Sequence, residues 1–300
     1  MENLLASLDK ENASPGDLKE LFNVCLGPEA PLDPELLPPR WPARSERMRY
    51  AWTEYYRALQ RLSEELYGVC ALALGLVRPR PRRTRTRRRA RRRLRRPPVR
   101  SPQPIDWFAD KIGRHRNCLR AINYPEQRHA PTPGQLRAST HTDYGALTIL
   151  RLGGAHPGGL QALGLGGEWV AVQDASDGFV INLGDLMARW TNDRWLSTPH
   201  RVVNPADGEA ARARRQSLAY FVNVNMDADI ECIPTCHGED GSKYPTIKAG
   251  EHLLTKHQQT VAGKLCYEAA ASSSSADRSS TPTPTPMDAE AASATPTPMR

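Results

Sequence analysis

The chain has 300 residues, enough for one large or two ordinary domains, and a formal net charge of +8. The charge is unevenly placed, because the segment from Arg78 to Arg100 holds 14 arginines and no acidic residue. Removing those 14 charges from +8 leaves −6 for the remainder. The sequence is therefore a mildly acidic body with one basic block, which excludes a uniformly basic nucleic-acid-binding domain.

The spacing of the cysteines and the first residues of the chain indicate the cellular compartment that we expect. The six cysteines show no small-scaffold spacing: Cys25, Cys70, Cys118, Cys232, Cys236 and Cys266. Such scattered thiols favour a reducing intracellular compartment over a disulfide framework. The first residues lack a basic segment followed by an apolar run, and no stretch is apolar for long enough to span a bilayer. We expect a cytoplasmic monomer without a membrane span.

Residues 1–76 are expected to form a helical N-terminal region. Asp17 to Val24 is interpreted as a short helical turn, and Ser45 is a candidate N-cap. From Met48 to Leu72 apolar residues recur at helical spacing. This pattern predicts a long amphipathic helix whose apolar face packs against something larger.

The segment Val77 to Pro104 consists of arginine and proline with little else, so we expect a disordered insert. One interpretation is a nucleic-acid, membrane-surface or nuclear-import patch. No aromatic residues lie between the arginines, so base stacking is not supported. The interpretation that we prefer is a dispensable insertion in a surface loop.

From Ile105 to residue 268 short strands dominate after a first expected helix, Ile105 to Ile112. Turn residues separate the expected strands, which are Cys118–Tyr124, Ala138–Leu150, Gly159–Leu163, Glu168–Gln173, Gly178–Leu183, Thr198–Val203 and Gln216–Val224. Strands this short and evenly spaced favour an all-β barrel or sandwich over a parallel α/β sheet. The fold class expected is mainly β with flanking helices.

Two further helices and a tail complete the expected organisation. Asp185 to Thr191 is a brief helix between strands, and Gly250 to Cys266 is a final helix. Residues 269–300 are mostly Ser, Thr, Pro and Ala, a composition that cannot bury a core, so we expect a disordered tail.

The chemistry is centred on His141 and Asp143, two residues apart in the expected strand Ala138–Leu150. Because side chains two apart in a strand project to one face, an imidazole and a carboxylate can point at one spot. Nitrogen and oxygen ligands in that arrangement suit a divalent metal. Such a spacing is also common by chance, and the alternative is a surface histidine beside a turn aspartate.

His200 begins another strand-like segment, with about three expected strands between it and Asp143. In a sandwich or barrel this separation can bring the chain back to a facing strand. Two histidines and one carboxylate on one side of an ion leave open positions for other ligands, the arrangement typical of non-haem Fe(II) oxygenases. His200 alone would be interpreted as a core or surface histidine near a proline turn.

Arg215 and Ser217 share a face at the start of the next expected strand. A guanidinium holds a carboxylate through two parallel charge-assisted hydrogen bonds, and a hydroxyl adds a third. The pair suits the distal carboxylate of a dicarboxylic cosubstrate. Arginines at the start of a strand are usually solvated, so the interpretation depends on the metal ligands that precede it.

In this combination and order the sequence resembles the Fe(II)/2-oxoglutarate-dependent dioxygenases, in particular their isopenicillin N synthase-like branch. The resemblance extends from Ile105 to about Cys266, and more loosely from Gly16 to Leu76. It is carried by His141–Thr148, Gly178–Asp185, Ser197–Val202, Arg215–Ser217, Asn123–Pro125 and Lys243–Glu251.

The resemblance implies a double-stranded β-helix (jelly-roll) core in residues 105–268. It implies that His141, Asp143 and His200 hold Fe(II). It further implies that 2-oxoglutarate chelates the iron and places its far carboxylate on Arg215 and Ser217, with Tyr124 as a lesser contact. In this family dioxygen and 2-oxoglutarate are consumed, with ascorbate as a candidate reductant, in the hydroxylation, desaturation or ring closure of a small organic substrate.

Three alternatives remain open at this point. The family has a longer N-terminal region, so residues 1–76 are expected to be a shortened form, and a truncated, inactive homologue is one alternative. A nucleic-acid-binding protein that acts through Arg78 to Arg100 is a second. A zinc site at Cys232, Cys236 and His237 is the third, although no fourth ligand lies at zinc-finger spacing.

Overall fold

The computed structural model describes residues 16–26, 41–76, 107–127, 129–153, 158–173, 177–204 and 214–260. The expected insert, 77–104, and the expected tail, 269–300, lie outside the described residues. Within the described ranges, no helix is both long enough and apolar enough to cross a membrane.

The described strands form two larger antiparallel sheets and a two-stranded ribbon. The five-stranded sheet has the order β1-β2-β9-β4-β7, and its strands are β1 (Glu20–Val24), β2 (Cys118–Tyr124), β4 (Leu147–Gly153), β7 (Val180–Leu183) and β9 (Arg215–Val222). The four-stranded sheet has the order β3-β8-β5-β6, and its strands are β3 (Ala138–His141), β5 (Leu160–Leu163), β6 (Trp169–Ala171) and β8 (His200–Val202). The expected β-rich core with flanking helices is confirmed.

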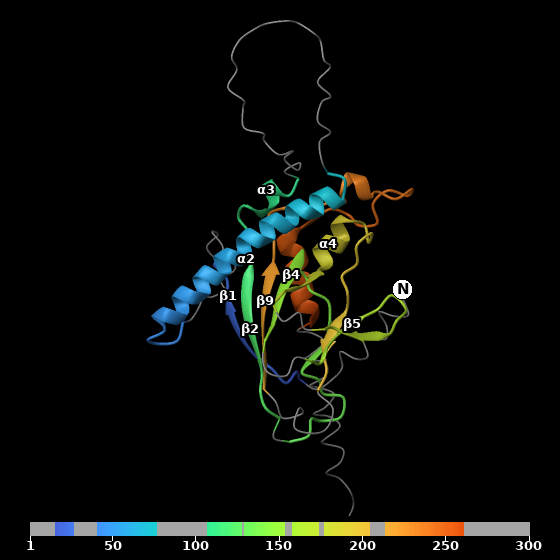
Figure 1. Ribbon diagram of the computed structural model, residues 1–300. Helices are drawn as coiled ribbons and strands as arrows, with labels where there is room; N and C mark the ends of the chain where they lie inside the picture. The colour runs from blue at the N-terminus through green and yellow to red at the C-terminus, as the bar shows by residue number, and fades with distance from the viewer. Residues whose placement is uncertain are drawn as a thin grey trace, which may run out of the picture.

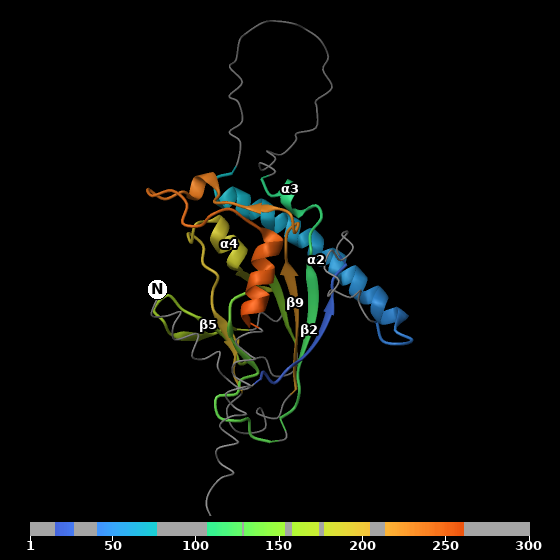
Figure 2. The same ribbon diagram turned by 180° about the vertical axis from the view of Figure 1, so that it is seen from behind.

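Helices flank these sheets on both sides. They are α2 (Glu46–Ala73), α3 (Ala109–Ile112), α4 (Asp185–Trp190) and the 3₁₀ helix η1 (Pro234–Cys236). Residues 249–260 are helical as well, and the ribbon pairs β10 (Asp229–Ile230) with β11 (Ile247–Lys248). Figure 1 shows α2 running diagonally across one side of the five-stranded sheet, and Figure 2 shows the helix of residues 249–260 on the opposite side.

The long helix α2 covers the outer face of the five-stranded sheet, as its apolar periodicity predicts. Tyr56 packs edge-on against Tyr220 of β9, with ring centroids 5.1 Å apart. The Tyr56 hydroxyl donates a hydrogen bond to the carbonyl of Asn117, at 3.0 Å. Ser45 occupies the N-cap position, as expected, but its side chain makes no capping hydrogen bond. The helix is therefore held by burial rather than by its cap.

A second apolar cluster fills the space between the two sheets. Its buried members are Tyr124, Ala138, Leu152, Leu160 and Val202, contributed by both sheets. Because this cluster holds β2 and β4 against β3 and β8, it fixes the distance between the strands that carry the candidate site residues.

Two local expectations are wrong. The segment expected as a helical turn, Asp17 to Val24, contains strand β1, because residues 20–24 pair with the edge of β2. The single strand expected over Ala138 to Leu150 is two strands, β3 and β4, which belong to different sheets. The chain bends at residues 142–146 to pass from one sheet to the other.

The burial of α2 gives a direct test of this packing. Replacing Leu59, which is 3% exposed, by alanine should lower the free energy of unfolding by about 2–5 kcal/mol, because it leaves a cavity against the sheet. The matched control is Leu72→Ala in the same helix, where Leu72 is 54% exposed. That change should stay within about 0.5 kcal/mol in urea unfolding. Equal effects of the two variants would contradict the packing of α2.

Candidate functional site

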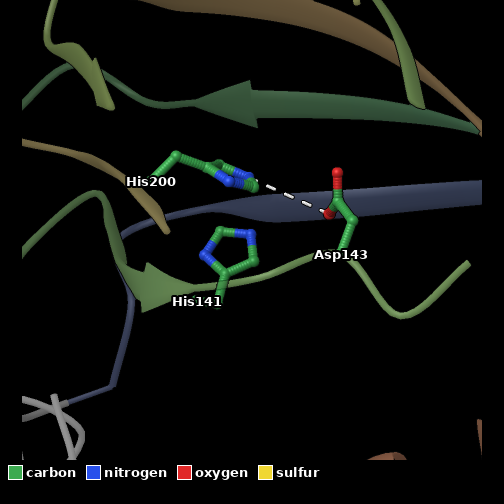
Figure 3. Close-up of side chains that lie close together, drawn as sticks. All are labelled: His141, Asp143 and His200. Atoms are coloured by element: carbon green, nitrogen blue, oxygen red, sulfur yellow. Dashed lines mark ion pairs between the residues drawn. The ribbon is translucent and has the colours of Figure 1, made fainter. Parts of the chain in front are cut away.

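The structure brings His141, Asp143 and His200 together, as the sequence predicts (Figure 3). One candidate ligand atom from each residue lies within 4.8 Å of those of the other two. No other group of three or more His, Cys, Asp and Glu side chains gathers in this way within the described residues. Two imidazole nitrogens and one carboxylate oxygen are suitable ligands for a divalent transition metal.

Strand pairing explains why the two histidines meet. His141 ends β3, His200 begins β8, and the two residues are direct partners in the antiparallel pair. Side chains of such partners lie on the same face of a sheet. Their ring centroids are accordingly 4.3 Å apart, and Nε2 of His200 lies 3.9 Å from Oδ1 of Asp143.

The backbone fixes which nitrogen of each histidine can bind a metal. Nδ1 of His141 lies 2.7 Å from the carbonyl oxygen of Ser139, and Nδ1 of His200 lies 3.1 Å from that of Thr198. A carbonyl oxygen only accepts, so each Nδ1 is the protonated nitrogen and donates. Both rings therefore have Nε2 free as a lone-pair donor, the form in which histidine binds a metal.

Two residues that sequence reasoning missed hold the carboxylate of Asp143. Thr148 Oγ1 and Asn182 Nδ2 each donate a hydrogen bond to Oδ2, both at 2.6 Å. Thr148 of β4 and Asn182 of β7 are direct partners in the five-stranded sheet. Because both bonds end on Oδ2, Oδ1 remains directed toward the histidines. The polar Asn182 in an otherwise apolar strand is the signal in the sequence that could have found this support.

The site favours a neutral His141 and an ionised Asp143. Burial and then the neighbouring His200 lower the pKa of His141 to about 4, although part of its side chain reaches solvent. Burial opposes ionisation of Asp143, but the imidazoles of His200 and His141 and the hydrogen bonds from Thr148 and Asn182 outweigh it. The pKa of the Asp143 carboxyl consequently lies below its usual value. These are the protonation states that metal binding requires.

The predicted anion-binding residues also meet in the interior. Tyr124 of β2 is the direct partner of Arg215 of β9, and the Arg215 guanidinium carbon lies 4.8 Å from the centroid of the Tyr124 ring. Arg215, Ser217 and Tyr124 are all buried. Burial raises the pKa of Tyr124, and contacts with Arg215 and Ser217 partly offset the rise. The three side chains thus form a buried cluster of hydrogen-bond donors, called the anion pocket below.

One atom of this pocket lacks a protein partner. Nη1 of Arg215 is buried and makes no hydrogen bond to any described residue. A buried guanidinium nitrogen without an acceptor is costly, and a bound carboxylate is the group that best satisfies it. The pocket therefore fits a carboxylate ligand.

Arg137 is a further residue that sequence reasoning missed. It is buried immediately before β3, and burial followed by the nearby Arg215 lowers its pKa. Two guanidinium groups close enough to repel each other in a buried place reinforce the preference for an anion there. No local pattern points to Arg137, because it does not belong to the Arg215–Ser217 motif.

Comparison with known proteins points to one family. Residues 116–224 match the model of the 2OG-Fe(II) oxygenase superfamily, and they include all six predicted site residues. This segment is therefore similar to the 2OG-Fe(II) oxygenase superfamily. The jelly-roll core expected from the resemblance is the core of this superfamily, and the two facing sheets are arranged accordingly.

Two curated relatives and one solved structure point to the same family as the model match. The chain is 27% identical over 237 residues to the 2-oxoglutarate-Fe(II) type oxidoreductase hxnY of Emericella nidulans, covering 77% of this chain and 58% of the relative. It is 30% identical over 230 residues to the proline hydroxylase buaE of Petromyces alliaceus, covering 72% and 60%. The crystal structure of a full-length Neurospora crassa protein in complex with alpha-KG has a TM-score of 0.65 and 28% identity, with 84% of this chain and 69% of that chain covered.

The chain spans less than two thirds of the length of these curated relatives, 58% of one and 60% of the other. The activity and substrate of the whole protein are accordingly matters of proposal.

The zinc alternative has no support in the described residues. Cys236 is buried in the core that α2 shares with the five-stranded sheet, and Cys232 packs against that core. Neither forms a metal-ligating group with His237 among the described residues. This segment of the oxygenase domain is interpreted as structural.

The hydrogen bond from Thr148 to Asp143 predicts a loss of metal affinity on its removal. Thr148→Val keeps the shape but removes the donor, and it should weaken Fe(II) or Mn(II) binding about 10- to 100-fold. Thr53→Val, where the hydroxyl bonds to the backbone of an exposed turn of α2, is the matched control and should leave affinity unchanged. Anaerobic titration measures both, and an unaltered Thr148→Val affinity would show that this bond does not orient Asp143.

Proposed function

We propose that the chain is an Fe(II)- and 2-oxoglutarate-dependent dioxygenase that hydroxylates or desaturates a small organic molecule. One observation carries the proposal: three suitable metal ligands lie in the same sheet sandwich as a buried guanidinium that lacks an acceptor. The first feature suits the metal and the second suits the far carboxylate of the cosubstrate.

The roles follow from the geometry. His141 and His200 present Nε2 and Asp143 presents Oδ1 to Fe(II). Arg215, Ser217 and Tyr124 bind the distal carboxylate of 2-oxoglutarate. When bound there, Fe(II) and 2-oxoglutarate would supply the oxidising chemistry with dioxygen, and ascorbate is the candidate reductant.

The chain's own residues orient these groups and exclude water. The hydrogen bonds from Thr148 and Asn182 hold the carboxylate of Asp143 in one rotamer, and the carbonyls of Ser139 and Thr198 hold the two rings. Holding ligands in place before binding removes the entropic cost of ordering them later. The apolar cluster between the sheets keeps the cosubstrate pocket dry, which strengthens the interaction of Arg215 with a carboxylate.

The named relatives support a small-molecule substrate. One is named a proline hydroxylase and another a validamycin A dioxygenase, and the similar Neurospora crassa structure contains alpha-KG. An inactive homologue is the weaker alternative, because all three predicted metal ligands are present and lie together, and Arg215 is present and buried. The alternative function, nucleic-acid binding, depends on Arg78 to Arg100, which lie outside the described residues.

The cytoplasmic location and the monomeric state remain predictions.

Anaerobic spectroscopy tests the proposal. Adding Fe(II) and then 2-oxoglutarate to the purified protein should produce the visible charge-transfer band of the chelate, and His141→Ala should abolish it. His237→Ala is the matched control, because His237 is exposed and does not belong to the metal-ligating group, and it should retain the band. Iron binding without a band would indicate an oxygenase that does not use 2-oxoglutarate, and no iron binding would favour the inactive homologue.

The role of Arg215 has a separate test. Arg215→Met should weaken 2-oxoglutarate binding about thirtyfold or more, the factor that corresponds to about 2 kcal/mol for one member of a buried charge pair. Binding of 2-oxopentanoate, which chelates metal but lacks the distal carboxylate, should change little. Arg214→Met, the adjacent exposed arginine bonded to Asn123, is the control. Equal losses for both 2-oxoacids would mean that Arg215 is structural.

A further inference from the structure

Two cysteines face each other at the edge of the five-stranded sheet. Strand β1 is the outermost strand of that sheet and pairs with β2. The last partners of the pair are Val24 and Leu119, so the antiparallel register places the next residue, Cys25, opposite Cys118. Cys25 is exposed, and Cys118 of β2 is partly buried. The two thiols are therefore distant in sequence but neighbours across the strand pair.

The spacing of an antiparallel strand pair suits a disulfide bond. Residues directly opposite each other have Cα atoms about 4.5 or 5.5 Å apart. Disulfides join cysteines whose Cα atoms are about 4.4 to 6.8 Å apart. The two side chains already meet, because the thiol of Cys118 donates a hydrogen bond to the sulfur of Cys25. A bond between the two sulfur atoms is therefore compatible with the backbone as it stands.

The surroundings of Cys25 favour its thiolate. The hydrogen bond from Cys118 lowers the pKa of the Cys25 thiol, burial opposes this, and the positive charges of Arg116 and then Arg120 lower it further. Arg120 is held at this place, because its Nε donates to Oδ1 of Asn23 on β1 at 2.8 Å. The same hydrogen bond, followed by burial, raises the pKa of Cys118 well above its usual value. Because the thiolate is the reactive form, Cys25 is the nucleophile of the pair.

The other described cysteines lie in different surroundings. Burial raises the pKa of Cys70 to about 11. Burial followed by the neighbouring Cys236 raises the pKa of Cys232. Cys236 itself is buried in the core that α2 shares with the sheet. Among the cysteines that the structure describes, Cys25 thus combines an exposed thiol with a neighbouring thiol and two cations.

We propose that Cys25 and Cys118 are a reversible redox pair, in which hydrogen peroxide converts the two thiols into a disulfide that fastens β1 to β2. The proposal is independent of the proposed function, because neither cysteine belongs to the metal-ligating group or to the anion pocket.

The reaction has two steps. The thiolate sulfur of Cys25 attacks one oxygen of hydrogen peroxide, the O–O bond breaks, and hydroxide leaves, so that Cys25 becomes a sulfenic acid. The thiol of Cys118 then loses its proton and its sulfur attacks the sulfur of Cys25. The S–S bond forms as the S–O bond breaks, and the second hydroxide takes up the proton from Cys118. In all, two thiols are oxidised and one peroxide is reduced to two molecules of water.

The disulfide would strengthen the attachment of an edge strand. On the opposite face of β1, Phe22 packs edge-on against Trp52 of α2, with ring centroids 5.3 Å apart. A bond between Cys25 and Cys118 closes a long loop that encloses α2 and therefore reduces the conformational entropy of the unfolded chain. We expect the oxidised protein to melt about 5–15 °C higher than the reduced protein.

Treatment of the full chain with peroxide tests the inference. Protein loaded with Mn(II), so that iron does not consume the oxidant, is exposed at neutral pH to about one and about ten equivalents of hydrogen peroxide. The parent should lose a pair of free thiols, and peptide mapping by mass spectrometry should find Cys25 joined to Cys118. Dithiothreitol should reverse both the cross-link and the rise in melting temperature.

Variants separate the two roles. Cys25→Ser should abolish the cross-link and slow the loss of thiols about tenfold or more. Cys118→Ser should leave the sulfenic acid of Cys25 without a thiol to attack it, so that dimedone traps it. Cys232→Ser is the matched control, because this partly buried cysteine packs against the core, and it should keep the cross-link of the parent.

Several outcomes would overturn the inference. They are a disulfide between any other two cysteines, a loss of thiols that Cys25→Ser does not slow, and no loss of thiols at ten equivalents of peroxide. A cross-link between Cys25 and Cys118 that leaves the melting temperature unchanged would show that the bond does not fasten β1.

Discussion

The buried carboxylate of Asp143 is the constraint on which the rest of the site depends. Asp143 follows closely after the last strand residue of one sheet, while its Oδ2 accepts hydrogen bonds from two strands of the other. The backbone carbonyl of Asp143 also accepts from the amide of Asp185 at the start of α4. An ionised carboxylate is costly to bury without such partners. These bonds therefore tie both sheets and a helix to one point.

Strand β9 connects this constraint to the buried Arg215. Arg215 and Ser217 lie buried near its beginning, and Phe221 lies beside Thr148 near its end. Because one strand carries both groups, the distance between Arg215 and the residues beside Thr148 is set by backbone geometry rather than by loops. A rigid separation of this kind is what an enzyme needs in order to hold two ligands against one metal.

Features that depend on local sequence pattern can be predicted, whereas features that depend on the pairing of distant strands cannot. Strands β2 and β9 and helix α2 follow from periodicity, and the candidate metal ligands follow from residue type and order. Thr148 and Arg137 could not be found, because their roles depend on which residues of distant strands lie next to them, whereas Asn182 left a signal as the polar residue of an apolar strand. Strand β1 was missed for a related reason, since pairing with the edge of β2 outweighs its local preference.

The break between β3 and β4 shows why three residues that lie together in the structure were predicted from an incorrect strand. In an unbroken strand His141 and Asp143 would share a face but would both be held by the four-stranded sheet. The bend instead delivers Asp143 to the donors of Thr148 and Asn182, while His141 stays paired with His200. The two kinds of ligand are thus fixed by different sheets, and the apolar cluster between the sheets sets the distance between them. A metal centre held in this way depends on the packing between the sheets as much as on its ligands.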